Sequence, residues 1–247
     1  MLREQSNKPV ETRKVLALDV GGTHIKVLMT GQKTPVKIIS GPKMTPGKMV
    51  RLVKQATRGW KYDCISMGYP GPVASGHPLL EPHNLACGWV GFNFRTAFGR
   101  PIKIINDAAM QALGSYKGGR MLFLGLGTGL GAAMIVDGVL EPMELAHLSY
   151  RHGKTYEDYI GLRGLKKEGK KKWRHDVTKI VRKLKAALQA DYVVLGGGNA
   201  KKLKHLPPGT TLGTNENAFK GGFRLWKDDG SPAVAQNEAK TIHTKNK

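Results

Sequence analysis

The sequence has few cysteines and lacks a hydrophobic run long enough to cross a membrane. Its two cysteines, Cys64 and Cys87, lie in unrelated contexts and match none of the spacings typical of a metal or redox site. No apolar stretch approaches the roughly 18 residues that a membrane-spanning helix needs, and the polar N-terminus lacks the apolar core of a signal peptide. These absences predict a cytoplasmic protein that makes no membrane contact.

Acidic residues are scarce beside the basic ones. The 247 residues include 40 lysines and arginines against 18 aspartates and glutamates, which gives a formal net charge of +22. Such a charge attracts polyanions, and the candidates are nucleic acid, an anionic membrane surface and inorganic polyphosphate. The sequence has no nucleic-acid-binding module and no interleaving of aromatic with basic residues. A basic nucleic-acid-binding protein is therefore a distant alternative, and a generally cationic surface without a specific partner explains the charge equally well.

Two glycine-rich turns are the most informative feature that is present. Their sequences are DVGGTH at residues 19–24 and GLGTGLG at residues 125–131, and the short apolar runs beside each turn are typical of β-strands. Glycines let backbone N–H groups converge on an anion, and each turn adds a threonine hydroxyl. A lone glycine-rich hairpin is usually only a tight turn. Two of them suggest two half-sites facing each other across a cleft, which suits phosphoryl transfer.

Two other phosphate-binding motifs are excluded by the sequence around these turns. The second turn formally matches the dinucleotide fingerprint, but that motif requires a helix to begin there. Residues 132–136 instead read as a strand that ends at the turn Asp137-Gly138. A Walker P-loop ends in Gly-Lys-Ser or Gly-Lys-Thr, which neither turn contains.

The rest of the chain alternates between predicted strands and helices. Apolar runs predict strands at 36–40, 64–68, 101–107 and 192–195. Helical spacing predicts helices at 46–56, after the N-cap Thr45, at 108–116, and at 173–188, where the helix is basic and has one apolar stripe. Residues 141–161 read as a polar loop region.

A glycine hairpin followed by a helix occurs twice along the chain, which suggests two lobes of related topology. We place an N-terminal α/β lobe at 15–107 and a C-terminal α/β lobe at 108–227. The polar segments 1–14 and 228–247 have no apolar pattern, and we expect both to be disordered.

Asp107 is a candidate catalytic residue because of its place just past an apolar strand. Open α/β sheets carry functional groups at the carboxyl ends of their strands. A carboxylate there could take the proton from an attacking hydroxyl group. An N-cap for the helix that follows is an equally good explanation of Asp107.

A mixture of carboxylate, amide and imidazole side chains is what polyol recognition needs, because these groups supply both donors and acceptors. Such side chains are Asn84, Asn106, Glu144, His147 and Glu157. The spacing of Glu144 and His147 would also fit a metal pair. Without a nearby cysteine or a second histidine at ligand spacing, we do not expect a metal there.

Six segments occur in order along the chain, namely 19–26, 70–73, 105–108, 124–131, 144–147 and 195–198. Together they resemble the ROK sugar kinases of the hexokinase–actin superfold, and the resemblance covers residues 15–227. Four more resemble the polyphosphate glucokinase branch of that family, namely 156–161, 169–173, 196–203 and 217–226.

The resemblance implies a two-lobed α/β fold, hexokinase/actin-like (ribonuclease H-like), with the active site in the interlobe cleft. It implies that Asp107 is the general base on the sugar 6-hydroxyl and that Asp19 positions Mg²⁺ through water. The side chains that would hold the sugar hydroxyls are Asn84, Asn106, Glu144, His147 and Glu157. The residues that would bind the phosphate donor are Asp19, Gly21, Gly22, Thr23 and Lys26 at the first turn, Gly127, Thr128 and Gly129 at the second, and Gly196, Gly197, Gly198, Lys201 and Lys202 at a third glycine cluster.

One departure from the family pattern concerns zinc. Most ROK kinases place a zinc-binding cysteine stretch shortly after the Glu-x-x-His motif. Here that segment is LSYRHGKT, residues 148–155, and it contains no cysteine. We therefore expect no zinc.

The interpretation that accounts for all these features is a polyphosphate-dependent glucokinase that acts on glucose with Mg²⁺. An ATP-dependent glucokinase, or a kinase for another hexose, is the alternative, and no specific nucleic-acid partner is expected. Lysines that could guide a long polyphosphate chain are Lys166, Lys167, Lys170, Lys171, Lys172, Lys201, Lys202 and Lys204. Two solvated helix faces would also explain these lysines. The sequence leaves donor preference, sugar range and oligomeric state, a homodimer included, open.

Overall fold

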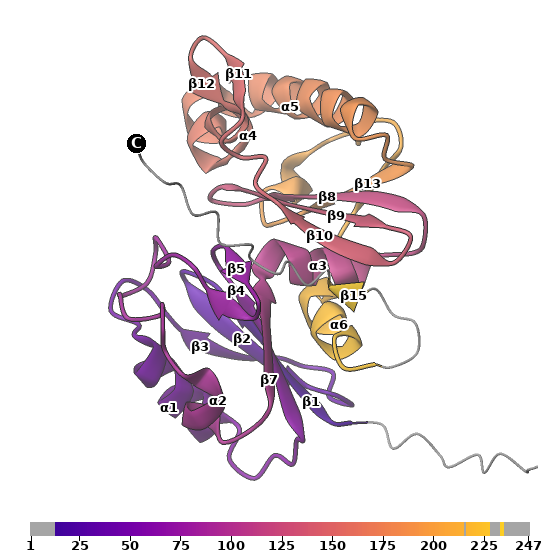
Figure 1. The fold of residues 1–247 in the computed structure, drawn as a ribbon. Coiled ribbons are helices and arrows are strands. Elements are labelled where there is room, and N and C mark those ends of the chain that lie inside the picture. The colour runs from indigo at the N-terminus through magenta and orange to yellow at the C-terminus, as the bar shows by residue number, and fades with distance from the viewer. Residues whose placement is uncertain (1–12, 215, 228–232, 235–247) are drawn as a thin grey trace, which may run out of the picture.

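The computed structural model describes residues 13–214, 216–227 and 233–234, and it contains two large β-sheets with helices packed on them (Figure 1). The first sheet has the strand order β3-β2-β1-β4-β7. Its strands are β1 (Val15–Val20), β2 (His24–Met29), β3 (Val36–Ile39), β4 (Cys64–Tyr69) and β7 (Ile102–Asn106). Because β1, β4 and β7 pair parallel, their carboxyl ends meet at one edge of the sheet.

The second sheet has the order β14-β13-β8-β9-β10-β15. Its strands are β8 (Arg120–Leu126), β9 (Leu130–Val136), β10 (Val139–Met143), β13 (Tyr192–Gly196), β14 (Thr210–Leu212) and β15 (Ala233–Val234). Both glycine turns join antiparallel strands, β1 to β2 and β8 to β9. The exclusion of the dinucleotide fingerprint is therefore confirmed, since a strand and not a helix follows the second turn.

Helices cover the outer faces of the two sheets. The first sheet is covered by α1 (Pro46–Ala56) and α2 (Phe94–Phe98), and the Thr45 side chain caps α1 by accepting from the Lys48 N–H, as predicted. The second sheet is covered by the long helix α5 (Leu162–Ala187), which bends at Gly169. Its predicted apolar stripe is buried against β8 and β13. This burial follows from the helical spacing of apolar residues on one side of a basic helix.

Two helices lie between the sheets and join them. Figure 1 shows α3 (Asp107–Ser115) between the second sheet and α6 (Asn217–Arg224). The buried residues of α3 pack with Ile105 of β7 on one side and with Phe123 and Ala133 of the second sheet on the other. The helix that follows the candidate base is thus anchored in both halves of the molecule.

Short elements occupy the segment predicted as a polar loop. Residues 141–161 contain part of β10, the hairpin of β11 (Ser149–Arg151) and β12 (Lys154–Thr155), and helix α4 (Tyr156–Ile160). The loop prediction is therefore wrong for much of this stretch, because hairpins this short leave no periodic signal. The other short elements are β5 (Val73–Ala74), β6 (His77–Pro78) and a 3₁₀ turn, η1 (Ala200–Lys202).

The two-lobed α/β architecture predicted from the sequence is confirmed. The expected disordered ends, 1–14 and 228–247, lie outside the described residues except for 13–14 and 233–234. Residues 233–234 form β15, which pairs parallel with β10, so this part of the expected tail is a strand. In the part of the chain that the structure describes, no helix is both long and apolar enough to cross a membrane.

Candidate active site

A pocket of about 260 Å³ opens between the two sheets. This volume is just below the range of about 300–1,000 Å³ that is usual for small-molecule sites, so the pocket suits a compact ligand. Both glycine turns, the end of β7 and helix α4 contribute to its wall. The lining residues are Gly22, Pro70, Gly71, Pro82, His83, Asn84, Asn106, Asp107, Gly125, Gly127, Gly129, Leu130, Gly131 and Glu157.

Seven of the predicted site residues line this pocket. They are Gly22, Asn84, Asn106, Asp107, Gly127, Gly129 and Glu157. The turns bring them together because two of the glycines lie directly against side chains from elsewhere. A Cβ on Gly22 would fall 2.7 Å from the Asn84 Cβ, and a Cβ on Gly129 would overlap the Glu157 carboxylate. Glycine is needed at position 22 for this close approach, whereas a Cβ at position 129 would displace the Glu157 carboxylate from the second turn.

The glycine turns are closed by their own backbone. The N–H groups of Gly21 and Gly127 donate to the carbonyls of His24 and Gly129, each at 3.1 Å. Thr23 and Thr128 are exposed. Since two N–H groups are used inside the turns, an anion here would have to be bound by the remaining N–H groups and by the threonine hydroxyls.

Asp107 lines the pocket as the first residue of α3. Burial raises the pKa of its carboxyl group to about 7, with a further contribution from the negative charge of Asp19. The Asn106 side chain, rather than Asp107, caps the helix: its Oδ1 accepts from Ala108 and Ala109 at 2.9 and 3.1 Å. The N-cap explanation of Asp107 is therefore wrong. Its carboxylate makes one short bond, to the Ala108 N–H at 2.7 Å, and faces the pocket.

Asn106 has a more structural role than predicted. Besides the two bonds that cap α3, its Nδ2 donates to the Gly71 carbonyl at 3.0 Å. This bond ties the end of β7 to the turn after β4, where Pro70 and Gly71 line the pocket. Asn106 thus shapes the pocket wall with the same amide group that was predicted to hold a hydroxyl.

Asp19 and Lys26 form an ion pair across β1 and β2. They are direct partners in the strand register, and Lys26 Nζ lies 2.8 Å from Asp19 Oδ2. The side chain of Asp19 is 13% exposed, so the lysine compensates a largely buried carboxylate. Lys26 also lowers the pKa of Asp107, although the effects of burial and of Asp19 are larger.

Glu144 and His147 lie outside the pocket lining. Their side chains are 66% and 71% exposed and face each other at 3.6 Å, between Oε1 and Nε2. Glu157, by contrast, reaches the second turn, where its Oε2 accepts from the Leu130 N–H at 2.9 Å. The structure thus brings one of the three predicted ligands from this segment to the pocket and leaves two on the surface.

The third glycine cluster lies behind the second turn rather than in the pocket. Gly197 has a φ of +80°, and a Cβ there would overlap the backbone of Leu126. Asn199, which the sequence did not single out, donates from Nδ2 to the Gly127 carbonyl at 2.8 Å. Its Oδ1 accepts from Lys202 Nζ at 2.6 Å. The cluster therefore supports the second turn from outside, and Lys202 is connected to it through Asn199.

His83 and Pro82 are pocket residues that the sequence did not indicate. They reach the site because Glu81 folds the segment after β6 on itself, with its carboxylate accepting from the N–H groups of Trp89 and Val90 at 3.0 and 3.2 Å. The Trp89 bond is the main reason that the pKa of Glu81 is lowered. The adjacent Asn84 was the only signal for this segment.

The carboxylates of Asp19 and Asp107 are close enough to interact electrostatically, which gives the site two hard oxygen donors. Among the described residues, no group of three or more His, Cys, Asp or Glu side chains is placed to hold a metal ion. Mg²⁺ commonly binds through one or two carboxylates and keeps several waters and substrate phosphates as ligands. The donor set therefore fits Mg²⁺ held in this way.

Comparison with known proteins yields a family match and curated relatives. The model of the ROK family matches residues 15–141. The polyphosphate glucokinase of Mycobacterium tuberculosis (strain CDC 1551 / Oshkosh) is 29% identical over 223 residues, which cover 81% of this chain and 83% of that protein. The glucokinase of Pyrobaculum calidifontis is 28% identical over 134 residues, covering 51% and 45%.

Solved structures share the fold. The inorganic polyphosphate/ATP-glucomannokinase from Arthrobacter sp. strain KM superposes with a TM-score of 0.73 at 21% identity, covering 85% of this chain and 97% of that one. A ROK family glucokinase from Streptomyces griseus, in complex with glucose and AMPPNP, has a TM-score of 0.65 at 14% identity, covering 84% and 97%. At these identities the likeness establishes the two-lobed hexokinase-like fold.

Proposed function

This chain belongs to the ROK family, and from that premise we propose that it is a sugar kinase that phosphorylates the 6-hydroxyl of glucose, with polyphosphate as its main donor. The observation that carries the proposal is Asp107. Its carboxyl group has a raised pKa and lies in a compact pocket between two glycine turns. A general base is most effective when its pKa is near the working pH.

The proposed reaction is a direct transfer. The sugar 6-oxygen attacks the terminal phosphorus of the donor, its proton passes to Asp107, and the bond from phosphorus to the bridging oxygen breaks. The donor leaves one phosphate shorter. Asn84, Asn106 and Glu157 would hold the other hydroxyls, and the turns would bind the transferring group. Most of the rate enhancement would come from positioning and charge stabilisation, as is general for phosphoryl transfer.

In this proposal Glu144 and His147 contact the sugar only after the segment that carries them moves toward the pocket. The Glu157 N–H donates to the Ala146 carbonyl at 3.1 Å, so this segment is attached to α4.

Mg²⁺ is the cofactor that the proposal requires, and Asp19 would hold it through water. When bound, the ion neutralises charge on the donor phosphates. Lys26 keeps the Asp19 carboxylate in place through their ion pair.

We expect metal analysis of the purified protein to find no stoichiometric zinc, because residues 148–155 contain no cysteine and include only one histidine. Soft thiolate ligands are what structural zinc sites in such short segments use. The measurement is elemental analysis after gel filtration, with a zinc-loaded standard as control. One tightly bound zinc per chain would contradict the expectation.

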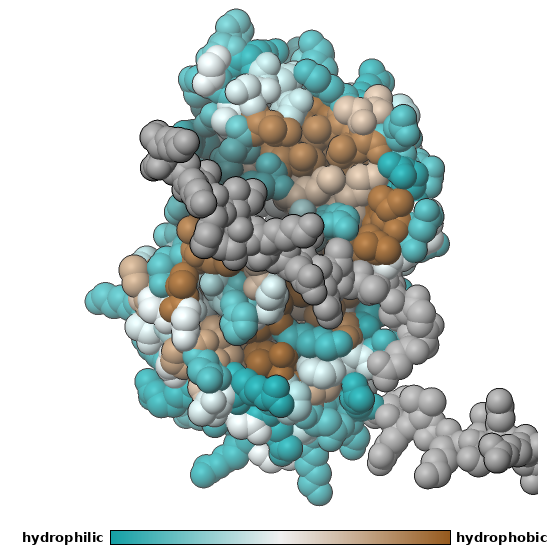
Figure 2. Space-filling model, viewed as in Figure 1, coloured by the Kyte–Doolittle hydropathy of each residue, from teal (hydrophilic) through white to brown (hydrophobic). Residues whose placement is uncertain are grey.

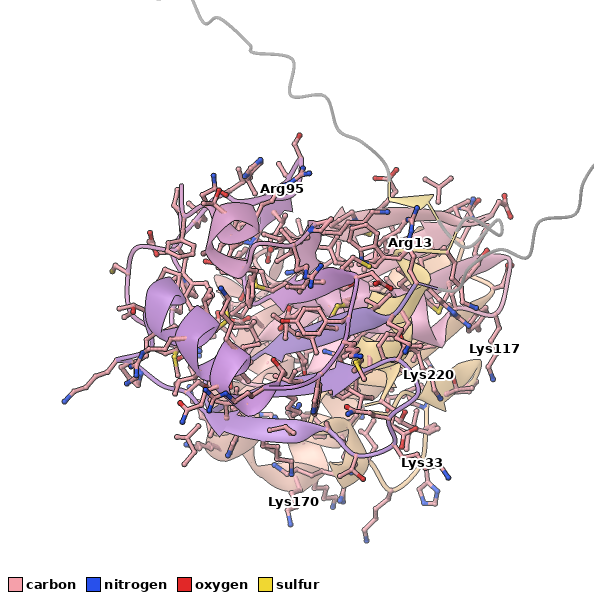
Figure 3. The ribbon with its side chains drawn as sticks, turned by 90° about the horizontal axis from the view of Figure 1, so that it is seen from below. Arg13, Lys33, Arg95, Lys117, Lys170 and Lys220 are labelled. Atoms are coloured by element: carbon pink, nitrogen blue, oxygen red, sulfur yellow. The ribbon has the colours of Figure 1, made fainter. Side chains whose placement is uncertain are left out.

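The donor half of the proposal depends on where the positive charge lies. Hydrophilic residues cover much of the periphery of both lobes in Figure 2, and the labelled side chains Lys33, Lys117 and Lys170 point outward on different sides of the molecule in Figure 3. The net charge alone therefore does not identify where a polyphosphate chain would run along the surface. Only a local concentration of lysines can identify that path.

Such a concentration occurs where α5 begins. The Leu162 N–H donates to the Thr128 carbonyl at 3.1 Å, so this helix starts against the second turn. Lys167 follows about 8 Å further along the helix at 1.5 Å per residue. The pKa of Lys167 is lowered, first by the adjacent Lys154 amine and also by Lys172. Amines crowded in this way favour a polyanion, and a long donor leaving the second turn would meet them.

The donor test compares polyphosphate and ATP in the same assay with glucose and Mg²⁺. We expect Lys167→Glu/Lys170→Glu to raise the KM for long-chain polyphosphate about tenfold and to leave the KM for ATP within about twofold, since counterion release scales with the number of phosphates contacted. The affinity for polyphosphate should also rise with chain length and fall more steeply with salt.

The matched control is Lys33→Glu/Lys117→Glu, which makes the same charge change at residues that lie elsewhere (Figure 3). Equal effects of salt and of both charge reversals on the two donors would contradict a polyphosphate path. The ATP-dependent glucokinase would then be the better assignment.

A further inference from the structure

We propose that the ion pair between the partly exposed Arg151 and the buried Asp176 is a positioning device that holds Glu157 against the sugar pocket. The proposal rests on the sugar-binding role proposed for Glu157. Neither residue of the pair lines the pocket, so the effect has to pass through the elements that they join.

The pair connects three elements. Arg151 lies in β11, Asp176 lies in α5, and Arg151 Nη2 approaches Asp176 Oδ1 at 2.7 Å. The Arg151 guanidinium also stacks 4.4 Å above the ring of Tyr159 in α4, and the Tyr159 hydroxyl donates to the Arg151 carbonyl at 3.4 Å. Figure 1 shows the β11–β12 hairpin and α4 gathered at one end of α5.

Helix α4 links the ion pair to the pocket. Thr155 and Asp158 form a capping box at its start, which fixes the backbone on either side of Glu157. The Glu157 carboxylate accepts from the Leu130 N–H at the second turn, at 2.9 Å. The Glu157 N–H in turn donates to the Ala146 carbonyl in the segment of Glu144 and His147. A displacement of α4 would therefore move every predicted sugar ligand of this region.

Stability alone does not explain why an ion pair, rather than two apolar residues, is found at this position. Asp176 is fully buried, and within the described residues its Oδ2 and the Arg151 Nε have no hydrogen-bond partner. An ion pair that takes a carboxylate out of water and leaves one of its oxygens without a partner is often no more stabilising than apolar residues of similar volume. A charged hydrogen bond has a preferred direction, and apolar contacts do not. The ion pair therefore fixes the position of β11 relative to α5, which two apolar residues would not do.

The test separates position from stability. We expect Asp176→Leu to lower the Tm, because it leaves the Arg151 charge unpaired, and Arg151→Met/Asp176→Leu to restore it. In the double variant the KM for glucose should remain about tenfold or more above that of the parent, because a shift of about 1 Å in the position of Glu157 weakens its contact with the sugar. The KM for the donor should stay within about twofold of that of the parent. Hydrogen exchange at the Leu130 and Glu157 amides should also be faster.

The matched control is Arg163→Met, which removes a more exposed ion pair that joins α5 to α4, from Arg163 Nη1 to Asp158 Oδ1 at 3.2 Å. It should change none of these readouts. If the double variant regains both the Tm and the parent's glucose KM and exchange rates, the pair is merely structural and the proposal is wrong. If the parent protein neither binds nor phosphorylates glucose, the proposed function fails, whereas hydrogen exchange at Leu130 and Glu157 still decides the positioning role.

Discussion

Replacing Asp107 by asparagine is expected to lower kcat about 10²–10⁴-fold, which is the usual loss when a general base is removed. Affinity for glucose should stay within a few-fold, because asparagine has the same shape and can still accept from the Ala108 N–H. Steady-state kinetics and calorimetry with glucose measure the two effects. Asp137→Asn, at an exposed carboxylate in the β9–β10 turn, is the matched control and should leave both unchanged.

The pH profile of the parent protein follows from the raised pKa of Asp107. Only the ionised carboxylate can accept a proton, so kcat/KM should fall about tenfold for each pH unit below a midpoint close to the pKa of about 7. This limb should be absent from the residual activity of Asp107→Asn. Activity of that variant within tenfold of the parent, with the limb retained, would assign the base to another residue.

The raised pKa of Asp107 also makes the stability of the folded protein depend on pH. A carboxyl group whose pKa is higher in the folded protein than in the unfolded chain favours folding while it is protonated and loses that contribution as pH rises through about 7. Asp107→Asn should therefore have a higher Tm than the parent at pH 8, and the difference should shrink toward pH 5. Thermal unfolding without Mg²⁺ measures this. Equal Tm values at pH 8 would mean that the burial of Asp107 is compensated in a way its known contacts do not show.

The parts of the site that were predictable from the sequence are those with a local signal. Glycines between apolar runs determine the two turns, and a polar residue at the end of an apolar run placed Asp107. The sequence could not decide whether Asp107 caps α3, because Asn106 and Asp107 are both good N-cap residues. The structure decides it through Asn106, whose side chain accepts from both Ala108 and Ala109.

The parts that were not predictable depend on contacts between distant segments. His83 lines the pocket because Glu81 accepts from two backbone N–H groups eight and nine residues later. Glu144 and His147 have the expected spacing, yet their position depends on how α4 is held, and Asp176 carried no visible signal in a basic helix. Likewise, the Ser66 hydroxyl donates to the Gly222 carbonyl 156 residues away, which no periodicity could indicate.

Helix α6, which carries Gly222, also crosses α3, and the largest effect on stability is expected at this crossing. Gly114 of α3 and Gly221 of α6 face each other so closely that a Cβ on either would overlap a backbone carbonyl of the other helix, Asn217 or Met110. Alanine for glycine inside a helix normally stabilises it by up to about 1 kcal/mol. Here we expect the opposite sign, a loss of about 1–3 kcal/mol or more, because backbone atoms cannot move aside as a flexible side chain can.

The sign reversal can be measured with one control. Gly47 in α1 has nothing within 4 Å of the position that a Cβ would take, so Gly47→Ala should raise the free energy of unfolding while Gly221→Ala lowers it. Urea unfolding of both variants gives the comparison. Because Asp107 is the first residue of α3, separating the two helices should also move its carboxylate, and a shift of about 1 Å can cost about 10²-fold in rate. Gly221→Ala should therefore lose kcat under conditions where it is still folded, and an unchanged kcat would show that α6 supports the fold without setting the position of the base.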